Sequence, residues 1–127
     1  MSVRLDHTIH YVKDRGETID FYTKVLGFEH RGSLGRFEVI VVNDDFTIDL
    51  VAKEEPELRH LAFAMDRERF EQIFERLESG GYTYGDGPSW MDNMRGPGRS
   101  TGTHGTTYSV YFHDPSGHQL EIITYEE

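Results

Sequence analysis

The spacing of apolar residues changes along this chain, and the changes predict the order of its strands and helices. Residues 5–12 have the pattern of a strand. Apolar residues then recur at helical spacing as far as Gly27, which suits a helix end, and Asp14 suits the N-cap. Three apolar or alternating runs separated by turn residues predict antiparallel strands over residues 28–31, 36–42 and 46–52. The first half therefore predicts the order β-α-β-β-β.

The second half repeats this order. Residues 58–65 resemble a strand, Asp66 can cap a following helix, and Gly80 with Gly81 can end it. Short strands are predicted over residues 82–84, 107–113 and 119–125. Local matches support a duplication: Leu5-Asp6-His7 corresponds to Leu58-Arg59-His60, and Thr47-Ile48-Asp49-Leu50 to Gln119-Leu120-Glu121-Ile122. We predict a single domain over residues 1–127, made of modules at about 1–53 and 57–127.

The second module is lengthened by a stretch rich in Gly and Pro over residues 85–106. Strand and helix periodicity are both absent from it, and a long connection of this kind inside a compact domain is usually functional or mobile. Trp90, Met91 and Met94 lie in this insert. They could cover a ligand as a hydrophobic lid, or be buried against the domain or a dimer mate.

Composition limits the possible partners. A net charge of −10 over 127 residues opposes binding to phosphate backbones, so we expect no nucleic-acid partner. No apolar run approaches the roughly 18 residues of a membrane helix, and the N-terminus has no signal-peptide pattern, which predicts a cytoplasmic protein without a membrane partner. The chain has no cysteine, so any metal must be held by nitrogen and oxygen ligands.

Strand parity selects four candidate metal ligands. Where alternate residues of a strand are apolar and face the helix, the residues between them lie on the other face. This places Asp49, His60 and Glu121 on non-helix faces, and the repeat aligns His7 with His60. Two imidazoles and one or two carboxylates suit Fe²⁺, Mn²⁺, Zn²⁺, Ni²⁺ or Co²⁺, and three protein ligands leave positions open for a substrate.

The segments Leu5-Asp6-His7, His60-Leu61-Ala62-Phe63 and Asp114-Pro115-Ser116-Gly117-His118-Gln119-Leu120-Glu121 resemble the vicinal oxygen chelate superfamily. That superfamily includes glyoxalase I, extradiol dioxygenases, fosfomycin-resistance enzymes and bleomycin-binding proteins. The resemblance implies an α+β fold in which two tandem βαβββ modules form a curved, cup-shaped antiparallel or mixed sheet. It also implies a divalent metal on the cup floor, held by His7, His60 and Glu121, that chelates neighbouring oxygens of a substrate.

Glyoxalase I-like members of the superfamily add a fourth ligand, commonly Glu, where this chain has Asp49. Asp49 could therefore be a ligand, a residue that supports a ligand, or a base. For proton transfer the candidates are Asp49 or a Glu121 displaced from the metal, and Tyr111 and His113 share a strand face that could line the cup.

Two classes of function follow from the resemblance. The first is a metal-dependent enzyme acting on a small molecule, either a glyoxalase-like lyase or isomerase, an extradiol-type dioxygenase, or a fosfomycin-resistance-like enzyme that opens an epoxide. The second is a metal-free binding protein of the bleomycin-resistance type. Because a single βαβββ module leaves an open sheet edge, we also expect a homodimer.

Overall fold

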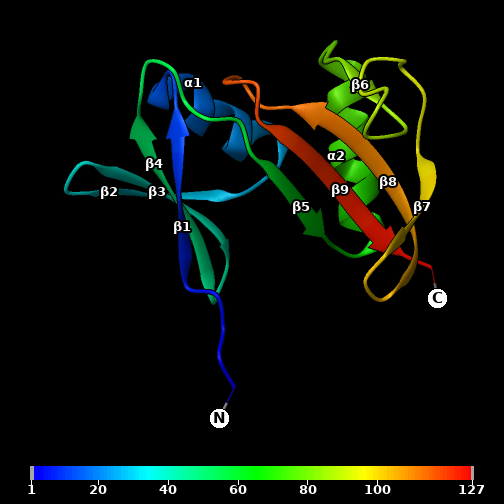
Figure 1. Cartoon of the computed structure of the whole chain (residues 1–127), viewed down its shortest axis with the longest axis horizontal. Helices are drawn as coiled ribbons and strands as arrows, with labels where there is room; N and C mark the ends of the chain where they lie inside the picture. The colour runs from blue at the N-terminus through cyan, green and yellow to red at the C-terminus, as the bar shows by residue number, and fades with distance from the viewer. Residues whose placement is uncertain (1, 127) are drawn as a thin grey trace. The chain divides into compact units, whose positions relative to one another are not determined.

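The computed structural model describes residues 2–126, and the chain divides into two compact units, one ending at Glu57 and the other beginning at Leu58. The first unit contains β1 (His7–Val12), α1 (Arg15–Asp20), the π-helical turn η1 (Phe21–Val25), β2 (Glu29–Leu34), β3 (Phe37–Asn43) and β4 (Phe46–Ala52) (Figure 1). The second contains β5 (His60–Ala64), α2 (Arg67–Ser79), β6 (Tyr84–Gly85), β7 (Gly98–Gly102), β8 (Gly105–His113) and β9 (Gln119–Tyr125). The predicted α+β fold built from repeated βαβββ modules is confirmed.

The two sheets share one pattern of strand pairing. The first unit has the strand order β1-β4-β3-β2, with β1 parallel to β4 and the other pairs antiparallel. The second has the order β5-β9-β8-β6, with β5 parallel to β9, and β7 also pairs with β8. The register of the parallel pairs is the same, because Ile9 lies opposite Asp49 and Ala62 lies opposite Glu121. The sequence repeat is therefore also a repeat in strand pairing.

Each helix begins where the sequence predicts a cap. The carboxylate of Asp14 accepts the backbone N–H of Glu17 at 2.9 Å, and that of Asp66 accepts the backbone N–H of Arg69 at 2.8 Å. These bonds satisfy N–H groups that the first helical turn leaves without an intrahelical partner.

The first helix changes form before it ends. It is α-helical only to Asp20 and then widens into the π-helical turn, in which Leu26 N–H bonds to Phe21 O at 3.4 Å. A side-chain bond from Thr23 Oγ1 to Ile19 O at 2.8 Å lies at this change. Gly27, at φ 75°, then turns the chain out of the helix, as predicted.

A hydrophobic core lies on the helix side of each sheet. In the second unit α2 packs on one face of the sheet and buries Phe70, Ile73 and Leu77 (Figure 1). The sheet residues that face it are almost completely buried and are Val110, Phe112, Leu120 and Ile122. Strand alternation leaves the opposite face for the polar residues that lie between these positions. Within residues 2–126, no helix is long and apolar enough to cross a bilayer.

The Gly- and Pro-rich insert is more ordered than its composition suggests. It contributes β7, which pairs with β8 through backbone hydrogen bonds, a role that needs no alternation of apolar side chains. The turn before β7 is closely packed, since a Cβ on Gly85 would lie 1.9 Å from the carbonyl oxygen of Trp90. Met91 is buried, whereas Trp90 and Met94 are exposed. Of the three apolar residues in the insert, only Met91 joins the core.

Candidate metal centre

His60 and Glu121 meet on one face of the second unit. His60 is the first residue of β5, and Glu121 lies on the neighbouring β9, two residues beyond Gln119, the residue opposite His60. Two positions along a strand return to the same face, so the side chains lie side by side. Nε2 of His60 is 2.6 Å from Oε1 of Glu121. The two candidate ligand atoms therefore lie in direct hydrogen-bonding contact.

Tyr111 lies next to this pair. It is opposite Glu121 in the antiparallel pairing of β8 with β9, and its side chain is almost completely buried. Burial raises the pKa of the Tyr111 phenol, and the negative charge of Glu121 raises it further, although a hydrogen bond with Ser100 acts in the opposite direction. The phenol is therefore a neutral hydrogen-bonding group beside a carboxylate at physiological pH.

His113 ends β8 on the same face as Tyr111, two residues further along the strand. It lies opposite Gln119, and its side chain is exposed. Together with Tyr111 it lines the surface on which the imidazole of His60 and the carboxylate of Glu121 lie.

The first unit carries the equivalent pair, His7 and Asp49. His7 lies opposite Thr47 in the parallel pairing of β1 with β4, and Asp49 follows two residues later on the same face. Asp49 is buried, and its Oδ1 accepts the hydroxyl of Thr47 at 2.9 Å. The shorter carboxylate is therefore held by a neighbour on its own strand.

Asp6 contacts His7 from outside the strand. Its Oδ2 lies 2.8 Å from Nδ1 of His7. This hydrogen bond is the main reason that the pKa of His7 is raised, with a smaller contribution from the negative charge of Asp49, and the same bond lowers the pKa of Asp6. The sequence interpretation missed this contact, and its only signal was an acidic residue directly before the histidine.

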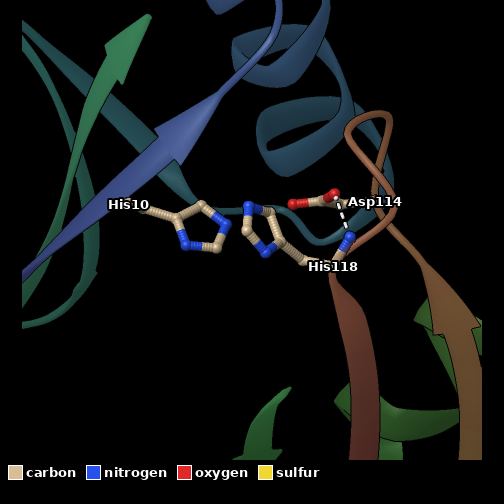
Figure 2. A group of neighbouring side chains, drawn as sticks. All are labelled: His10, Asp114 and His118. Atoms are coloured by element: carbon tan, nitrogen blue, oxygen red, sulfur yellow. Dashed lines mark hydrogen bonds between the residues drawn. The ribbon is translucent and has the colours of Figure 1, made fainter. Parts of the chain in front are cut away.

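Three other residues offer metal-ligating atoms: His10 of the first unit, and Asp114 and His118 of the second (Figure 2). The carboxylate of Asp114 accepts the backbone N–H groups of Ser116 and His118, each at 3.0 Å, so it holds the turn before β9. Nδ1 of His118 accepts the backbone N–H of Arg59 at 3.0 Å. These bonds give Oδ1 of Asp114 and Nδ1 of His118 a structural role in the turn and at the start of β5.

His10 has a packing role in the first unit. It lies on the opposite face of β1 from His7, as expected from their odd separation, and is completely buried. Its Nε2 lies 3.1 Å from the hydroxyl of Tyr22, and the two rings meet edge to face.

The donor set of the two pairs fits a divalent metal ion. Imidazole nitrogen and carboxylate oxygen are ligands that first-row divalent ions prefer, and ligand bonds of about 2.0–2.2 Å place two such atoms about 3 Å apart on one ion. The 2.6 Å contact between His60 and Glu121 is close to that spacing. The structure groups the four predicted ligands as two pairs, His7 with Asp49 and His60 with Glu121, each within one unit.

Known proteins of one superfamily match almost the whole chain. The sequence pattern of the Glyoxalase/Bleomycin resistance protein/Dioxygenase superfamily matches residues 4–122. Glutathione transferase FosA of Serratia marcescens is 29% identical over 125 residues, which cover 93% of this chain and 78% of that protein.

Two solved structures resemble the fold closely. Oxidase ChaP-H2 has a TM-score of 0.82 at 29% identity, with 99% of this chain and 96% of that chain covered. Virulence protein STM3117 of Salmonella typhimurium has a TM-score of 0.78 at 25% identity, with 99% of each chain covered. These relatives differ in the activities that their names state, so the likeness alone does not select a reaction.

Proposed function

The chain belongs to the glyoxalase/bleomycin resistance protein/dioxygenase superfamily, and we propose from this that it is a divalent-metal-dependent enzyme acting on a small molecule. The substrate would bind through neighbouring oxygen atoms. The observation that carries the proposal is the 2.6 Å contact between Nε2 of His60 and Oε1 of Glu121, matched by His7 and Asp49 in the equivalent register. The strand register of the two pairs is the same in both modules, and the direct contact is made by the pair of the second module.

In this proposal His7, His60 and Glu121 hold the ion, which is Fe²⁺, Mn²⁺, Zn²⁺, Ni²⁺ or Co²⁺. When bound, such an ion acts as a Lewis acid that stabilises negative charge developing on the substrate oxygens. Asp49 is either a fourth ligand or a base. Its hydrogen bond from Thr47 fixes one carboxylate oxygen and leaves the other to accept a proton or to bind the ion.

Tyr111 and His113 have supporting roles in the reaction. The phenol of Tyr111 stays protonated at neutral pH, so it can donate a hydrogen bond to a substrate oxygen that becomes more negative. His113 is exposed on the same face and can exchange a proton with solvent. A Glu121 carboxylate released from the ion would be a second possible base.

Two reactions are favoured by specific relatives. The relative named glutathione transferase favours transfer of a thiol, which we propose opens an epoxide. The structural neighbour named oxidase favours an oxidation, which we propose is of the extradiol type. An anionic substrate would need a cation, and Lys53 supplies one, with its ammonium 5.2 Å from the ring of Tyr11, which shares the face of His7. Arg99 is a weaker candidate because Glu126 already pairs with its guanidinium.

The metal requirement can be tested with the purified chain. Each of the five ions is added at about 100 times its dissociation constant, where binding to the folded state alone stabilises it by about 2.7 kcal/mol. His60→Ala should abolish this stabilisation by the metal. The control His104→Ala changes an exposed histidine of the same unit and should retain the stabilisation. Metal binding that survives His60→Ala but is lost in His10→Ala or His118→Ala would overturn the ligand assignment.

The reaction is tested separately, after metal loading. An epoxide with glutathione, a catechol with dioxygen, and a 2-oxoaldehyde with glutathione are supplied to the loaded protein. Turnover of one class that is lost in His60→Ala identifies the reaction. If no ion binds, the enzyme proposal fails and the metal-free binding alternative is left.

A homodimer and a cytoplasmic location complete the proposal. β1 and β2 are the edges of the first sheet and β5 is an edge of the second, so each of these strands pairs with a neighbour on one side within its own sheet, and its other side faces out of the sheet. Light scattering at several protein concentrations measures the molar mass and so the oligomeric state. A monomer at all of them would exclude the dimer.

A further inference from the structure

We propose that Asp6 is a positioning residue that holds the imidazole of His7 by Nδ1 and thereby directs Nε2 to the metal. This inference rests on the proposed function, because it assumes that His7 is a ligand. It concerns a residue outside the predicted ligand set, and it explains why the two histidine ligands have different surroundings.

The hydrogen bond decides which nitrogen of His7 carries the proton. An ionised carboxylate can only accept, so the 2.8 Å contact between Oδ2 of Asp6 and Nδ1 of His7 requires the proton on Nδ1. In the neutral ring the lone pair is then on Nε2. Carboxylates that bind the far nitrogen of a metal-ligating histidine fix its tautomer and orientation in this way.

The backbone makes this contact possible. Neighbouring residues in a strand point to opposite faces, so two residues both inside β1 could not meet. Asp6 lies just before β1, and its carbonyl oxygen accepts the backbone N–H of Thr47 at 3.1 Å. This bond ties the backbone of Asp6 to β4 beside the position where His7 lies opposite Thr47.

The second oxygen of the Asp6 carboxylate also has a partner. Nη2 of Arg4 lies 3.7 Å from Oδ1, while Oδ2 faces His7. Arg4 and Asp6 are both mostly exposed, so solvent weakens the pair. The effect of Asp6 on metal affinity should therefore lie at the lower end of the range for carboxylates that support a ligand.

The equivalent position in the second unit cannot play this part. Arg59 precedes His60 as Asp6 precedes His7, and its backbone N–H donates to Nδ1 of His118. The residue before His60 therefore supplies no carboxylate that could bind the imidazole. His60 instead contacts Glu121 through Nε2, the nitrogen that is left open in His7.

The test compares Asp6→Ala and Asp6→Asn with Asp20→Ala. Asp20 is an exposed aspartate of the same unit that pairs with Lys24 at 3.6 Å, so its loss changes the charge equally. Calorimetric titration with Zn²⁺ or Mn²⁺ should show a loss of affinity of about tenfold in Asp6→Ala, near the lower end of the 10–100-fold typical of such partners. Asp6→Asn should bind the metal more tightly than Asp6→Ala, because the amide oxygen of asparagine still accepts a hydrogen bond. Asp20→Ala should bind as the unmodified protein does.

A metal-free measurement distinguishes positioning from charge. Nitrogen-15 spectra of the imidazole, recorded at a pH where the ring is neutral, should show the His7 proton on Nδ1 in the unmodified protein and a shift toward Nε2 in Asp6→Ala. Unchanged affinity in Asp6→Ala, or an affinity loss with an unchanged tautomer, would overturn the inference. His7→Ala should abolish binding to the full site; if it does not, the proposed ligand set fails independently of Asp6.

Discussion

Nε2 of His60 and Oε1 of Glu121 lie 2.6 Å apart, a contact that needs a proton between an imidazole and a carboxylate. A metal that takes both groups as ligands must displace that proton, because a ligating nitrogen cannot keep it. We therefore expect metal binding to release protons at a pH where the imidazole is protonated, because a neutral ring can instead carry its single proton on Nδ1. Calorimetric titrations in buffers of different ionisation enthalpy measure the number released. At that pH, heats that do not depend on the buffer would show that this contact is not broken by the metal.

Glu121→Gln keeps the shape of the side chain and removes its charge. Because a neutral amide is a poor ligand for these ions, we expect metal affinity to fall by more than about 100-fold, the upper end for residues that only support a ligand. Equilibrium dialysis measures the affinity. Glu75→Gln, on an exposed position of α2, is the matched control and should bind normally. Equal binding by both variants would remove Glu121 from the site.

Tyr111 should make stability fall at high pH. Its pKa is raised by burial above the ordinary value of about 10, so the unfolded chain releases this proton at lower pH than the folded chain does. The contribution of Tyr111 to stability is fully present below about pH 10, and it is lost as the pH rises through the raised pKa. Urea unfolding between pH 8 and 11 should show a smaller decline in Tyr111→Phe, with Tyr82→Phe, an exposed tyrosine of the same unit, as the control. Equal declines would contradict the pKa argument.

Glu38 should make stability fall at low pH. The hydroxyl of Ser33 and then the imidazole of His30 hydrogen-bond to its carboxylate, and these bonds lower its pKa below the usual 4.5. The stabilisation is present above about pH 4.5 and is lost as the pH falls toward the lowered pKa. Glu38→Gln should therefore lose less stability between pH 6 and 3 than the unmodified protein. Unfolding by urea at each pH measures the difference, and parallel curves would contradict it.

Asp66 should contribute about 1 kcal/mol to the stability of the second unit. Its carboxylate accepts the backbone N–H of Arg69 at the start of α2, and loss of such a cap costs about 0.5–2 kcal/mol. Asp66→Ala should lower the free energy of unfolding by this amount, and Asp66→Asn should retain most of it. Urea denaturation monitored by circular dichroism is the measurement. Equal losses in both variants would show that the cap bond is not the cause.

The elements with a clear period could be predicted from the sequence. The sequence predicts strands over residues 46–52 and 119–125, and β4 and β9 have these bounds. Both strands begin with alternating apolar and polar residues. The apolar residues define the face of each strand that is buried. The caps at Asp14 and Asp66 could also be predicted, because capping is a local property of a few residues.

The parts that escaped prediction depend on contacts that leave no period. β7 is built from Gly, Ser and Thr and is held by its pairing with β8. The π-helical turn keeps almost the same apolar spacing as an α-helix, so periodicity cannot separate the two. The contact of Asp6 with His7 depends on where β1 begins, and strand ends are the least certain part of a sequence-based prediction.

The shared register of β1 with β4 and of β5 with β9 means that the two units carry equivalent strand pairs, each with one of the proposed histidine ligands. The units differ here by one methylene, Asp49 against Glu121, and by the residue before each histidine, Asp6 against Arg59. The longer carboxylate reaches its histidine, while the shorter one bonds to Thr47. Each unit can therefore serve as the experimental reference for the other, and exchange of these two pairs of residues would measure how far the chain length of the carboxylate and the residue before the histidine set the properties of each pair.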